Sequence, residues 1–336
     1  MLRNALLASL FVVALSPAAP AWDRGEATTF ARLPAGERNP EGIAVDRTTG
    51  DVYVADFDFR GTNDGKGHVH VFNKEGKFLR TLSLTGVPGS TALLGLDFHP
   101  ASHALLVIDF GAQQVLKVNP QTGASTLFTK VNAAAGLNAL TFDKDGNVYI
   151  SDSFQGIIWK TGPAGGAATQ WARSVLLTTT GKPPFGANGI SFDKRGSMLV
   201  ANTGDDTVVK IPPGGGVETA TVLTNSINGA DGLLIDEDGN IWVCANQSDE
   251  IVVIAPTGKE IAKLGDFDGI SERGESRGFL FPASPVFAGE FVLVTNLALD
   301  TNLFGFNSID AGWAAQVKTY TVSKIKRRIP PIHDDD

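Results

Sequence analysis

The chain of 336 residues is long enough for one large domain or two average ones. Its formal net charge of -8 argues against nucleic acid or an anionic membrane surface as its partner. With 38 glycines, 43% hydrophobic residues and only 19% charged residues, the composition suits a compact all-β protein with many tight turns and excludes a disordered chain.

The N-terminus has the pattern of a secretory signal peptide. Arg3 supplies a positive charge, an apolar run covers residues 6–15, and Ala19-Pro20-Ala21 fits a cleavage site between small residues. The apolar run is shorter than the roughly 20 residues that a bilayer span needs. We therefore expect residues 1–21 to be removed and the mature chain, from Trp22, to be secreted or periplasmic, without membrane insertion; an uncleaved anchor is the alternative. No linker divides residues 22–336, which predicts one domain.

A six-residue pattern, with a small apolar frame behind a variable first residue, recurs along the mature chain. Its copies begin at Glu41, Leu94, Asn138, Asn188 and Asp231, and a weaker sixth copy surrounds Ser284. The first residues are 43 to 53 positions apart. Several copies continue with a turn and a second apolar run, as Asp145-Gly146 does before Val148-Tyr149-Ile150, which is a strong hairpin signal.

Two further strands follow the hairpin in each repeat, for example at residues 69–72 and 78–81. Four antiparallel strands in every 40 to 55 residues are typical of a propeller blade. The sequence therefore predicts an all-β, six-bladed β-propeller, with a strand at 28–33 that closes the ring. No segment after the signal peptide has a convincing helical period.

The first residues of the repeats are the candidate functional residues. The first strand of each propeller blade lines the central channel, so we expect Glu41, Leu94, Asn138, Asn188, Asp231 and approximately Ser284 to form a ring at one mouth of the channel. Two carboxylates that face two amides are costly to bury unless a positive charge lies between them. Oxygen ligands without His or Cys select a hard divalent cation, calcium first, with magnesium, manganese or zinc as alternatives. The other interpretation is that these side chains bind water in a wet channel.

Other polar residues have simpler interpretations. The second strands end in acidic or amide residues that we expect to cap turns: Asp56, Asp109, Asp152, Asn202, Asn246 and Asn296. The loops at residues 57–67 and 183–186 are candidates for the walls of a binding pocket. Cys244, the only cysteine, lies in an apolar run and is expected to be a buried small hydrophobe. The histidines show no metal-ligand spacing, and His68 and His70 are expected to face one side of a strand.

The segments that begin Glu41-Gly42, Asn188-Gly189 and Asp231-Gly232 resemble the metal-binding segments of the senescence-marker-protein/gluconolactonase family, to which regucalcin belongs, and more distantly those of paraoxonases. The repeats also resemble NHL repeats. The first resemblance implies a six-bladed propeller in which Glu41, Asn188 and Asp231 hold one divalent ion, Asn138 lies beside the substrate or is a further ligand, and Asp231 transfers the proton. Sugar lactonases of the family commonly have aspartate and arginine where this chain has Ala139 and Gly136, and Leu94 stands where paraoxonases have a histidine.

These observations lead to two hypotheses from different functional classes. In the first, the protein is an exported metal-dependent hydrolase of a lactone or related ester, in which the metal activates water, Asp231 is the general base and acid, and Asn138 contacts the small-molecule substrate. In the second, it is a non-catalytic NHL-type propeller that binds a ligand or a protein partner.

Overall fold

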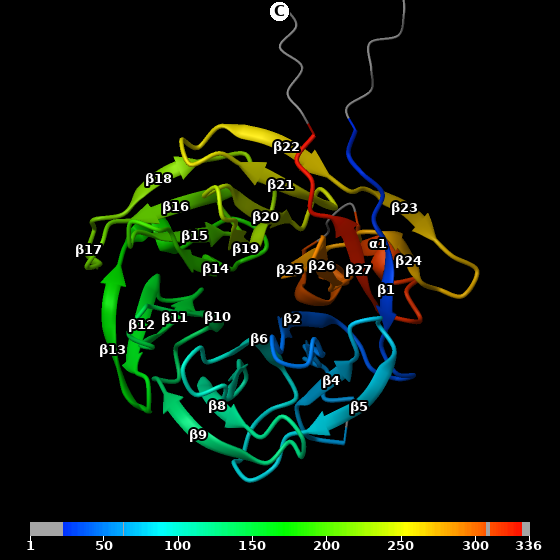
Figure 1. Ribbon diagram of the computed structural model, residues 1–336, viewed down its shortest axis with the longest axis horizontal. Coiled ribbons are helices and arrows are strands. Elements are labelled where there is room, and N and C mark those ends of the chain that lie inside the picture. Colours follow the sequence, from blue (N-terminus) through cyan, green and yellow to red (C-terminus); the bar gives the residue numbers. More distant parts are fainter. Residues whose placement is uncertain (1–22, 63, 307–309, 331–336) are drawn as a thin grey trace, which may run out of the picture.

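Each recurrence of the six-residue pattern forms the innermost strand of a sheet of four antiparallel strands, to which blade 3 adds a short fifth strand. The computed structural model describes residues 23–62, 64–306 and 310–330, so the predicted signal peptide lies outside the described residues. Six sheets surround a central axis, and the inner strands of neighbouring sheets contact one another around the ring (Figure 1). The inner strands of blades 1 to 6 are β2 (Pro40–Val45), β6 (Leu93–Phe98), β10 (Leu137–Phe142), β14 (Ala187–Phe192), β19 (Ala230–Ile235) and β25 (Pro282–Ala288).

The remaining strands follow in order toward the outside of each blade. Blades 1 and 2 continue with β3 (Val52–Asp56), β4 (His68–Phe72), β5 (Phe78–Ser83) and with β7 (Leu105–Asp109), β8 (Gln114–Val118), β9 (Ser125–Lys130). Blade 3 continues with β11 (Val148–Asp152), β12 (Ile157–Gly162), β13 (Gly165–Arg173) and a short parallel edge strand, β17 (Gly216–Val217). Blades 4 and 5 continue with β15 (Met198–Asn202), β16 (Thr207–Ile211), β18 (Thr221–Thr224) and with β20 (Ile241–Ala245), β21 (Glu250–Ile254), β22 (Glu260–Leu264).

The two ends of the described chain close the ring in blade 6. This blade consists of β25, β26 (Phe291–Asn296), β27 (Thr321–Lys326) and the N-terminal strand β1 (Thr28–Arg32), which pairs antiparallel with β27 (Figure 1). Arg32 also donates from Nε and Nη2 to the carboxylate of Glu275, at 2.7 and 2.9 Å. The predicted six-bladed propeller and its closing strand are therefore confirmed.

The other elements are short. A hairpin of β23 (Phe267–Ile270) and β24 (Ser276–Gly278) precedes blade 6, and the helical segments are η1 (Val175–Leu177), η2 (Thr301–Phe304) and α1 (Ala311–Ala314). Among the described residues no helix is long and apolar enough to cross a membrane. The small amount of helix in the described residues agrees with the missing helical period in the sequence.

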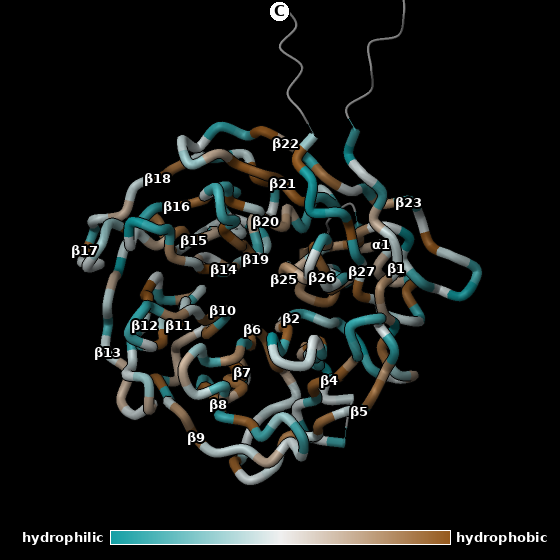
Figure 2. The backbone as a smooth tube through the Cα atoms, in the orientation of Figure 1, coloured by the Kyte–Doolittle hydropathy of each residue, from teal (hydrophilic) through white to brown (hydrophobic). Residues whose placement is uncertain are grey.

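Both faces of each blade are covered by the neighbouring blades, which explains the apolar second strands. Every residue of β3, β7, β11 and β20 is buried, and clusters of apolar side chains fill the space between consecutive blades, as Tyr53 and Leu105 do between blades 1 and 2. Hydrophobic stretches recur around the ring, and the turn between β23 and β24 is hydrophilic (Figure 2). Burial of this apolar surface is the main stabilising contribution.

A β-bulge at the same place in every inner strand positions the candidate site. In blade 1, Pro40 pairs with Asp56 but Ile43 pairs with Val54, so residues 41 and 42 both lie opposite Ala55. The other inner strands have the same irregularity. The first residue of each bulge is Glu41, Leu94, Asn138, Asn188, Asp231 and Ala283. The sixth position, expected approximately at Ser284, is Ala283, because Pro282 pairs with Asn296 as Pro40 pairs with Asp56.

The glycine that follows the first residue in several repeats allows the inner strands to approach closely. A Cβ atom on Gly42 would lie 2.3 Å from the Leu94 carbonyl oxygen, and one on Gly189 would lie 2.5 Å from the Asp231 carbonyl oxygen. Neither contact is compatible with a side chain. The narrow channel mouth therefore depends on these glycines.

Candidate metal centre at the channel mouth

Five of the six residues at the first bulge position line one small cavity. Glu41, Leu94, Asn138, Asn188 and Asp231 surround a space of about 40 Å³, and all five are buried. This space has room for an ion with one or two waters, since one water needs roughly 10–15 Å³. The structure thus brings together all four residues proposed as metal ligands, while their roles stay predictions.

Two asparagines in the ring are held in place by hydroxyl groups. Asn138 donates from Nδ2 to Ser153 Oγ at 3.3 Å, and Asn188 donates from Nδ2 to Thr203 Oγ1 at 3.1 Å. Both hydroxyls then donate to a backbone carbonyl of the next inner strand, that of Ala187 or Ala230, at 2.6 and 2.7 Å. These contacts use the amide NH₂ groups, so the amide oxygens remain available for a ligand.

Four buried oxygen atoms among the residues that line this cavity have no hydrogen-bond partner in the described part of the chain. They are Glu41 Oε2, Asn138 Oδ1, Asp231 Oδ1 and Asn246 Oδ1. An unsatisfied buried acceptor costs about 1–3 kcal/mol, and more when it is charged. Four of them at a single cavity require donors or a positive charge that the described residues do not supply, and either bound water or a cation would supply them.

The electrostatics of the two carboxylates support the interpretation as a cation site. Burial and the nearby Asp231 raise the pKa of Glu41 well above its ordinary value. Burial raises the pKa of Asp231 to about 7, although hydrogen bonds from Asn246 and Asn188 partly oppose this rise. No lysine, arginine or histidine lines the cavity among the described residues. A divalent cation with oxygen ligands fits this set of donors, because it would favour the ionised form of both carboxylates.

Asn246 also lines this cavity, although it was not among the residues predicted to bind the metal. It was predicted to cap a turn, but its Nδ2 donates to Asp231 Oδ2 at 2.9 Å and its oxygen is one of the four unsatisfied atoms. Asn246 follows the last residue of β20 and so occupies the place that Ser153 and Thr203 occupy in blades 3 and 4. This one-residue offset in the sequence was the signal that could have identified it.

Three of the other strand-end residues, Asp109, Asp152 and Asn202, cap the turns that follow them, as predicted, whereas Asp56 and Asn296 contact more distant parts of the chain. Asp109 accepts from the amide of Ala112, and Asp152 accepts from the amides of Phe154 and Gln155. Asn202 accepts from the Asp205 amide, and Asn296 from the Leu280 amide. These residues stabilise the loops around the cavity without lining it.

Apolar side chains form the remaining walls of the cavity. They are Phe57, Pro183, Phe185, Phe281, Leu297 and Leu299. The two loops predicted to wall a pocket therefore do so through Phe57, Pro183 and Phe185. Phe185 also contacts Phe154, whose side chain is 48% exposed, with ring centroids 5.7 Å apart. An aromatic surface thus leads from the exterior to the polar centre.

The two positions that differ from sugar lactonases contribute no polar group to this centre. Neither Gly136 nor Ala139 lines the cavity. Gly136 donates its amide to Asp152, and a Cβ at this position would lie 2.7 Å from the Phe154 ring. An arginine therefore has no room at position 136 while Phe154 keeps its place.

The surroundings of Cys244 disfavour a role as a nucleophile in this centre. It lies in β20 opposite the bulge of blade 5, is fully buried, and is a free thiol, as predicted. Burial, together with the charges of Asp231 and Glu41, raises the pKa of its thiol well above the ordinary value. The thiolate required for nucleophilic attack is therefore suppressed.

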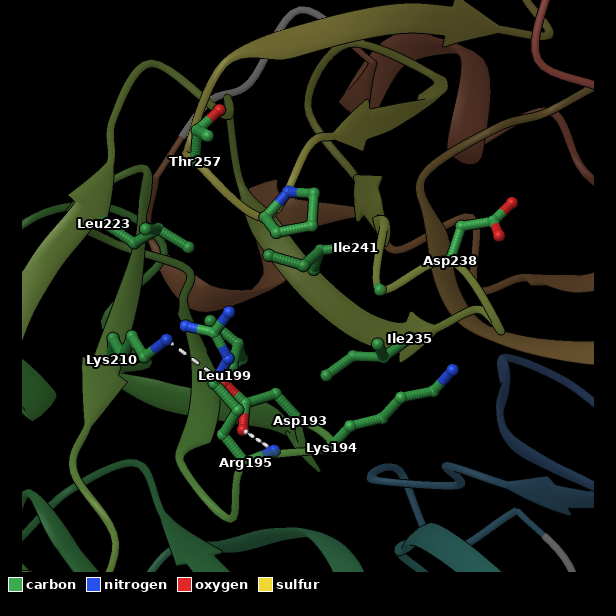
Figure 3. Close-up of a pocket in the computed structure, with 12 residues that line it drawn as sticks. Asp193, Lys194, Arg195, Leu199, Lys210, Leu223, Ile235, Asp238, Ile241 and Thr257 are labelled. Atoms are coloured by element: carbon green, nitrogen blue, oxygen red, sulfur yellow. Dashed lines mark hydrogen bonds and ion pairs between the residues drawn. The ribbon is translucent and has the colours of Figure 1, made fainter.

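A larger hollow lies between blades 4 and 5, at the opposite end of their strands, but it has no comparable set of groups. Its volume is about 370 Å³. Figure 3 shows the charged residues that line it, among them Asp193, Arg195 and Lys210. Asp193 accepts from Lys210 Nζ at 3.1 Å and from the Arg195 amide at 2.8 Å, so its carboxylate is already paired (Figure 3). This hollow is therefore a groove between blades and not a competing candidate centre.

The fold is shared with several solved enzymes and binding proteins. The chain is similar to a provisionally assigned gluconolactonase, with a TM-score of 0.61 and 16% identity over 90% of this chain and 92% of that one. It is similar to the calcium-binding protein regucalcin from Agrobacterium tumefaciens, with a TM-score of 0.60 and 16% identity over 90% and 97%. Virginiamycin B lyase from Staphylococcus aureus gives a TM-score of 0.55 and 14% identity over 81% and 82%. At these low identities, the similarity shows a shared fold. The sequence matches no family model and no curated protein.

Proposed function

We propose that the protein is an exported hydrolase of lactones or related esters that depends on one divalent cation at the channel mouth. The observation that carries this proposal is the group of four unsatisfied oxygens beside two buried carboxylates. The sequence resemblance to the gluconolactonase family and the propeller fold shared with regucalcin support the same chemistry. The apolar run at residues 6–15 supports export.

Glu41, Asn188, Asp231 and Asn138 would hold the cation, with calcium the first choice because all the donors are oxygens. Asn246 would contribute a fifth oxygen, since its Oδ1 is unsatisfied among the described residues. A divalent cation at such a site polarises an ester carbonyl and acidifies water. The hydroxyls of Ser153 and Thr203 would keep the two ring amides in their present orientation.

Asp231 would transfer the proton. Its Oδ2 is held by Asn246, whereas Oδ1 has no donor among the described residues, so this carboxylate can accept a proton from the attacking water. The same group would return the proton to the alcohol that leaves. The cation would lower the pKa of Asp231 below its value of about 7 in the protein alone, so that the ionised carboxylate is the form that accepts the proton at neutral pH. Asn138 would donate to or orient the substrate beside this group.

The walls of the cavity favour an apolar substrate over a sugar lactone. Phe57, Phe185 and Phe281 offer no hydrogen bonds, and the arginine and aspartate positions of sugar lactonases are Gly136 and Ala139. The cavity itself accommodates only the reacting carbonyl end. We therefore expect the apolar part of the substrate to lie on the aromatic surface of Phe185 and Phe154.

A hydrolysis screen of the mature protein tests this proposal. Aliphatic lactones of increasing chain length, a sugar lactone and aryl esters would be compared with calcium, after chelation and after calcium is restored. We expect turnover that rises with chain length, is lost on chelation and returns with calcium. Absence of turnover with all substrates, together with normal calcium binding, would favour the non-catalytic NHL-type propeller that binds a ligand or protein partner.

A further inference from the structure

A second group of potential metal ligands lies in blade 1, outside the central cavity. Glu37, Asp56 and His70 each offer one ligand atom, and these atoms lie within 4.8 Å of one another. Glu37 belongs to the segment between β1 and β2, Asp56 ends β3, and His70 lies in β4. Because the three residues come from different elements, their sequence spacing gave no indication of a site. The sequence shows no metal-ligand spacing among the histidines because these three residues come together only in the folded chain.

His70 is the residue that points to a missing ligand. Its side chain is fully buried, and its Nε2 has no hydrogen-bond partner in the described part of the structure. The nearest acidic oxygens, Glu37 Oε2 and Asp56 Oδ2, are each 3.7 Å from Nε2. This separation is too long for a hydrogen bond. It is close to the spacing of roughly 3–4 Å between donors that each lie about 2 Å from one ion.

The surroundings orient these groups as ligands. His70 Nδ1 lies 3.0 Å from Thr81 Oγ1, and when Nδ1–H donates to this hydroxyl, Nε2 presents its lone pair to the carboxylates. His68, on the same side of β4, places its Nδ1 3.1 Å from Glu37 and its Nε2 3.1 Å from Asp64. The prediction that His68 and His70 face one side of a strand is confirmed. Hydrogen bonds of this kind commonly orient metal ligands and increase their affinity.

We propose that Glu37, Asp56 and His70 form a second metal site, which binds a first-row transition ion such as zinc. One imidazole nitrogen with two carboxylate oxygens is a donor set that zinc accepts and that calcium disfavours. Glu37 and Asp64 are partly exposed, which gives an ion a path to the site. The two metal sites of the chain thus differ in chemistry: oxygen alone at the channel mouth, and nitrogen with oxygen in blade 1.

This second site would stabilise the closure of the ring. Glu37 lies in the segment that leads from β1 in blade 6 to β2 in blade 1, and in the same segment Asn39 donates to the Leu297 carbonyl of blade 6 at 2.8 Å. An ion shared by Glu37, Asp56 and His70 would tie this segment to β3 and β4. Because the ion binds only the folded chain, it would raise the thermal midpoint of unfolding.

Metal titration of the tag-free mature protein tests the proposal. Zinc would be titrated into chelator-treated protein in the presence of excess calcium, which fills the channel-mouth site, and a chromophoric chelator would compete for the zinc. In a separate titration, the visible absorption of cobalt would report ligation by nitrogen. We expect one zinc equivalent in the wild type and in the Glu41→Gln/Asp231→Asn variant, so this result does not depend on the hydrolase proposal. His70→Gln and Glu37→Gln should weaken zinc at least about 100-fold, and His68→Gln about 10-fold. His103→Asn, which removes an exposed histidine, should bind as the wild type does.

The opposite results would overturn the proposal. It is wrong if the wild type takes up no zinc at micromolar concentration. It is also wrong if zinc binds His70→Gln or Glu37→Gln as it binds the wild type. Glu37→Gln alters a partly exposed side chain and so keeps the test valid if His70→Gln fails to fold. A zinc-dependent rise in the thermal midpoint that persists in Glu37→Gln would contradict the role in ring closure.

Discussion

Asn246 Nδ2 donates a 2.9 Å hydrogen bond to Asp231 Oδ2 at the channel mouth, where both side chains are buried. This bond occupies one oxygen of the carboxylate, while the other oxygen and the amide oxygen of Asn246 remain without a donor among the described residues. Asn246 therefore orients the group proposed to transfer the proton and adds an oxygen to the proposed cation site.

Replacing Asn246 with alanine should weaken the cation site more than the fold. The variant loses the bond to Asp231 and one potential ligand, so we expect calcium affinity to fall about 10–100-fold. The free energy of unfolding without calcium should change by only about 1 kcal/mol. Calcium titration calorimetry and chemical denaturation measure the two effects. Asn225→Ala, at an exposed position, is the control, and equal calcium affinity in the two variants would contradict the assignment.

Removing either buried carboxylate should stabilise the calcium-free protein and abolish its response to calcium. Glu41→Gln and Asp231→Asn remove groups whose ionisation is opposed by burial, and for Glu41 also by the charge of Asp231. We expect the unfolding midpoint in chelator to rise by a few degrees, which corresponds to about 1–2 kcal/mol. Calcium should raise the midpoint of the wild type and of the exposed control Asp238→Asn, but not that of the two variants. A lower midpoint of both variants in chelator would show that the carboxylates are already satisfied.

Asp249 should make the protein less stable as the pH rises. Burial, with the charge of Asp310, raises the pKa of Asp249 to about 8. In the unfolded chain this aspartate ionises near pH 3.8. Between about pH 4 and 8 the folded chain therefore keeps a proton on Asp249 that the unfolded chain has lost, so the free energy of unfolding falls as the pH rises. Asp249→Asn keeps an acceptor for the Phe281 amide and tolerates the positive φ of 53° at this position. Denaturation at pH 5 and pH 8 should show a smaller loss of stability in this variant, by about 1–3 kcal/mol. The same slope in both proteins would be the contrary result.

Gly189→Ala should destabilise the ring of inner strands. The added Cβ would meet the Asp231 carbonyl oxygen at 2.5 Å, so β14 and β19 would have to move apart. We expect a loss of at least about 2 kcal/mol in the free energy of unfolding, together with weaker calcium binding. Gly162→Ala is a matched control, since a Cβ there meets no atom within 4 Å. Similar stability of the two variants would mean that the inner strands are not closely packed at this point.

The propeller could be predicted from the sequence because its signals are local and repeated. The apolar frame of each repeat forms the inner strand, and the aspartate that ends four of the repeats caps the following turn. Asp46, Asp143, Asp193 and Asp236 each accept from the amide two residues further on. In blade 2, His99 replaces this aspartate and accepts from the amides of Ala101 and Ser102 through Nδ1. The repeated pattern therefore contains the residues that cap the turns as well as those that form the core.

The candidate centre could be predicted only where each ligand holds the same place in its repeat. Glu41, Asn138, Asn188 and Asp231 share the bulge position and lie around one cavity. Asn246 was missed, and the sixth position was expected approximately at Ser284 and not at Ala283, because a shift of one residue in strand register is not visible in an apolar pattern. The cluster of Glu37 and His70 was missed for another reason. It depends on contacts between a connecting segment and two different strands, which no repeat encodes.

Turnover by the Glu41→Ala/Asp231→Ala double variant is the most direct test of the cation-dependent hydrolysis. The wild type should hydrolyse its best lactone with calcium, and chelation should abolish this activity. The double variant should remain inactive with or without calcium while retaining a cooperative unfolding transition. Undiminished hydrolysis by the double variant in chelator would contradict the proposed function.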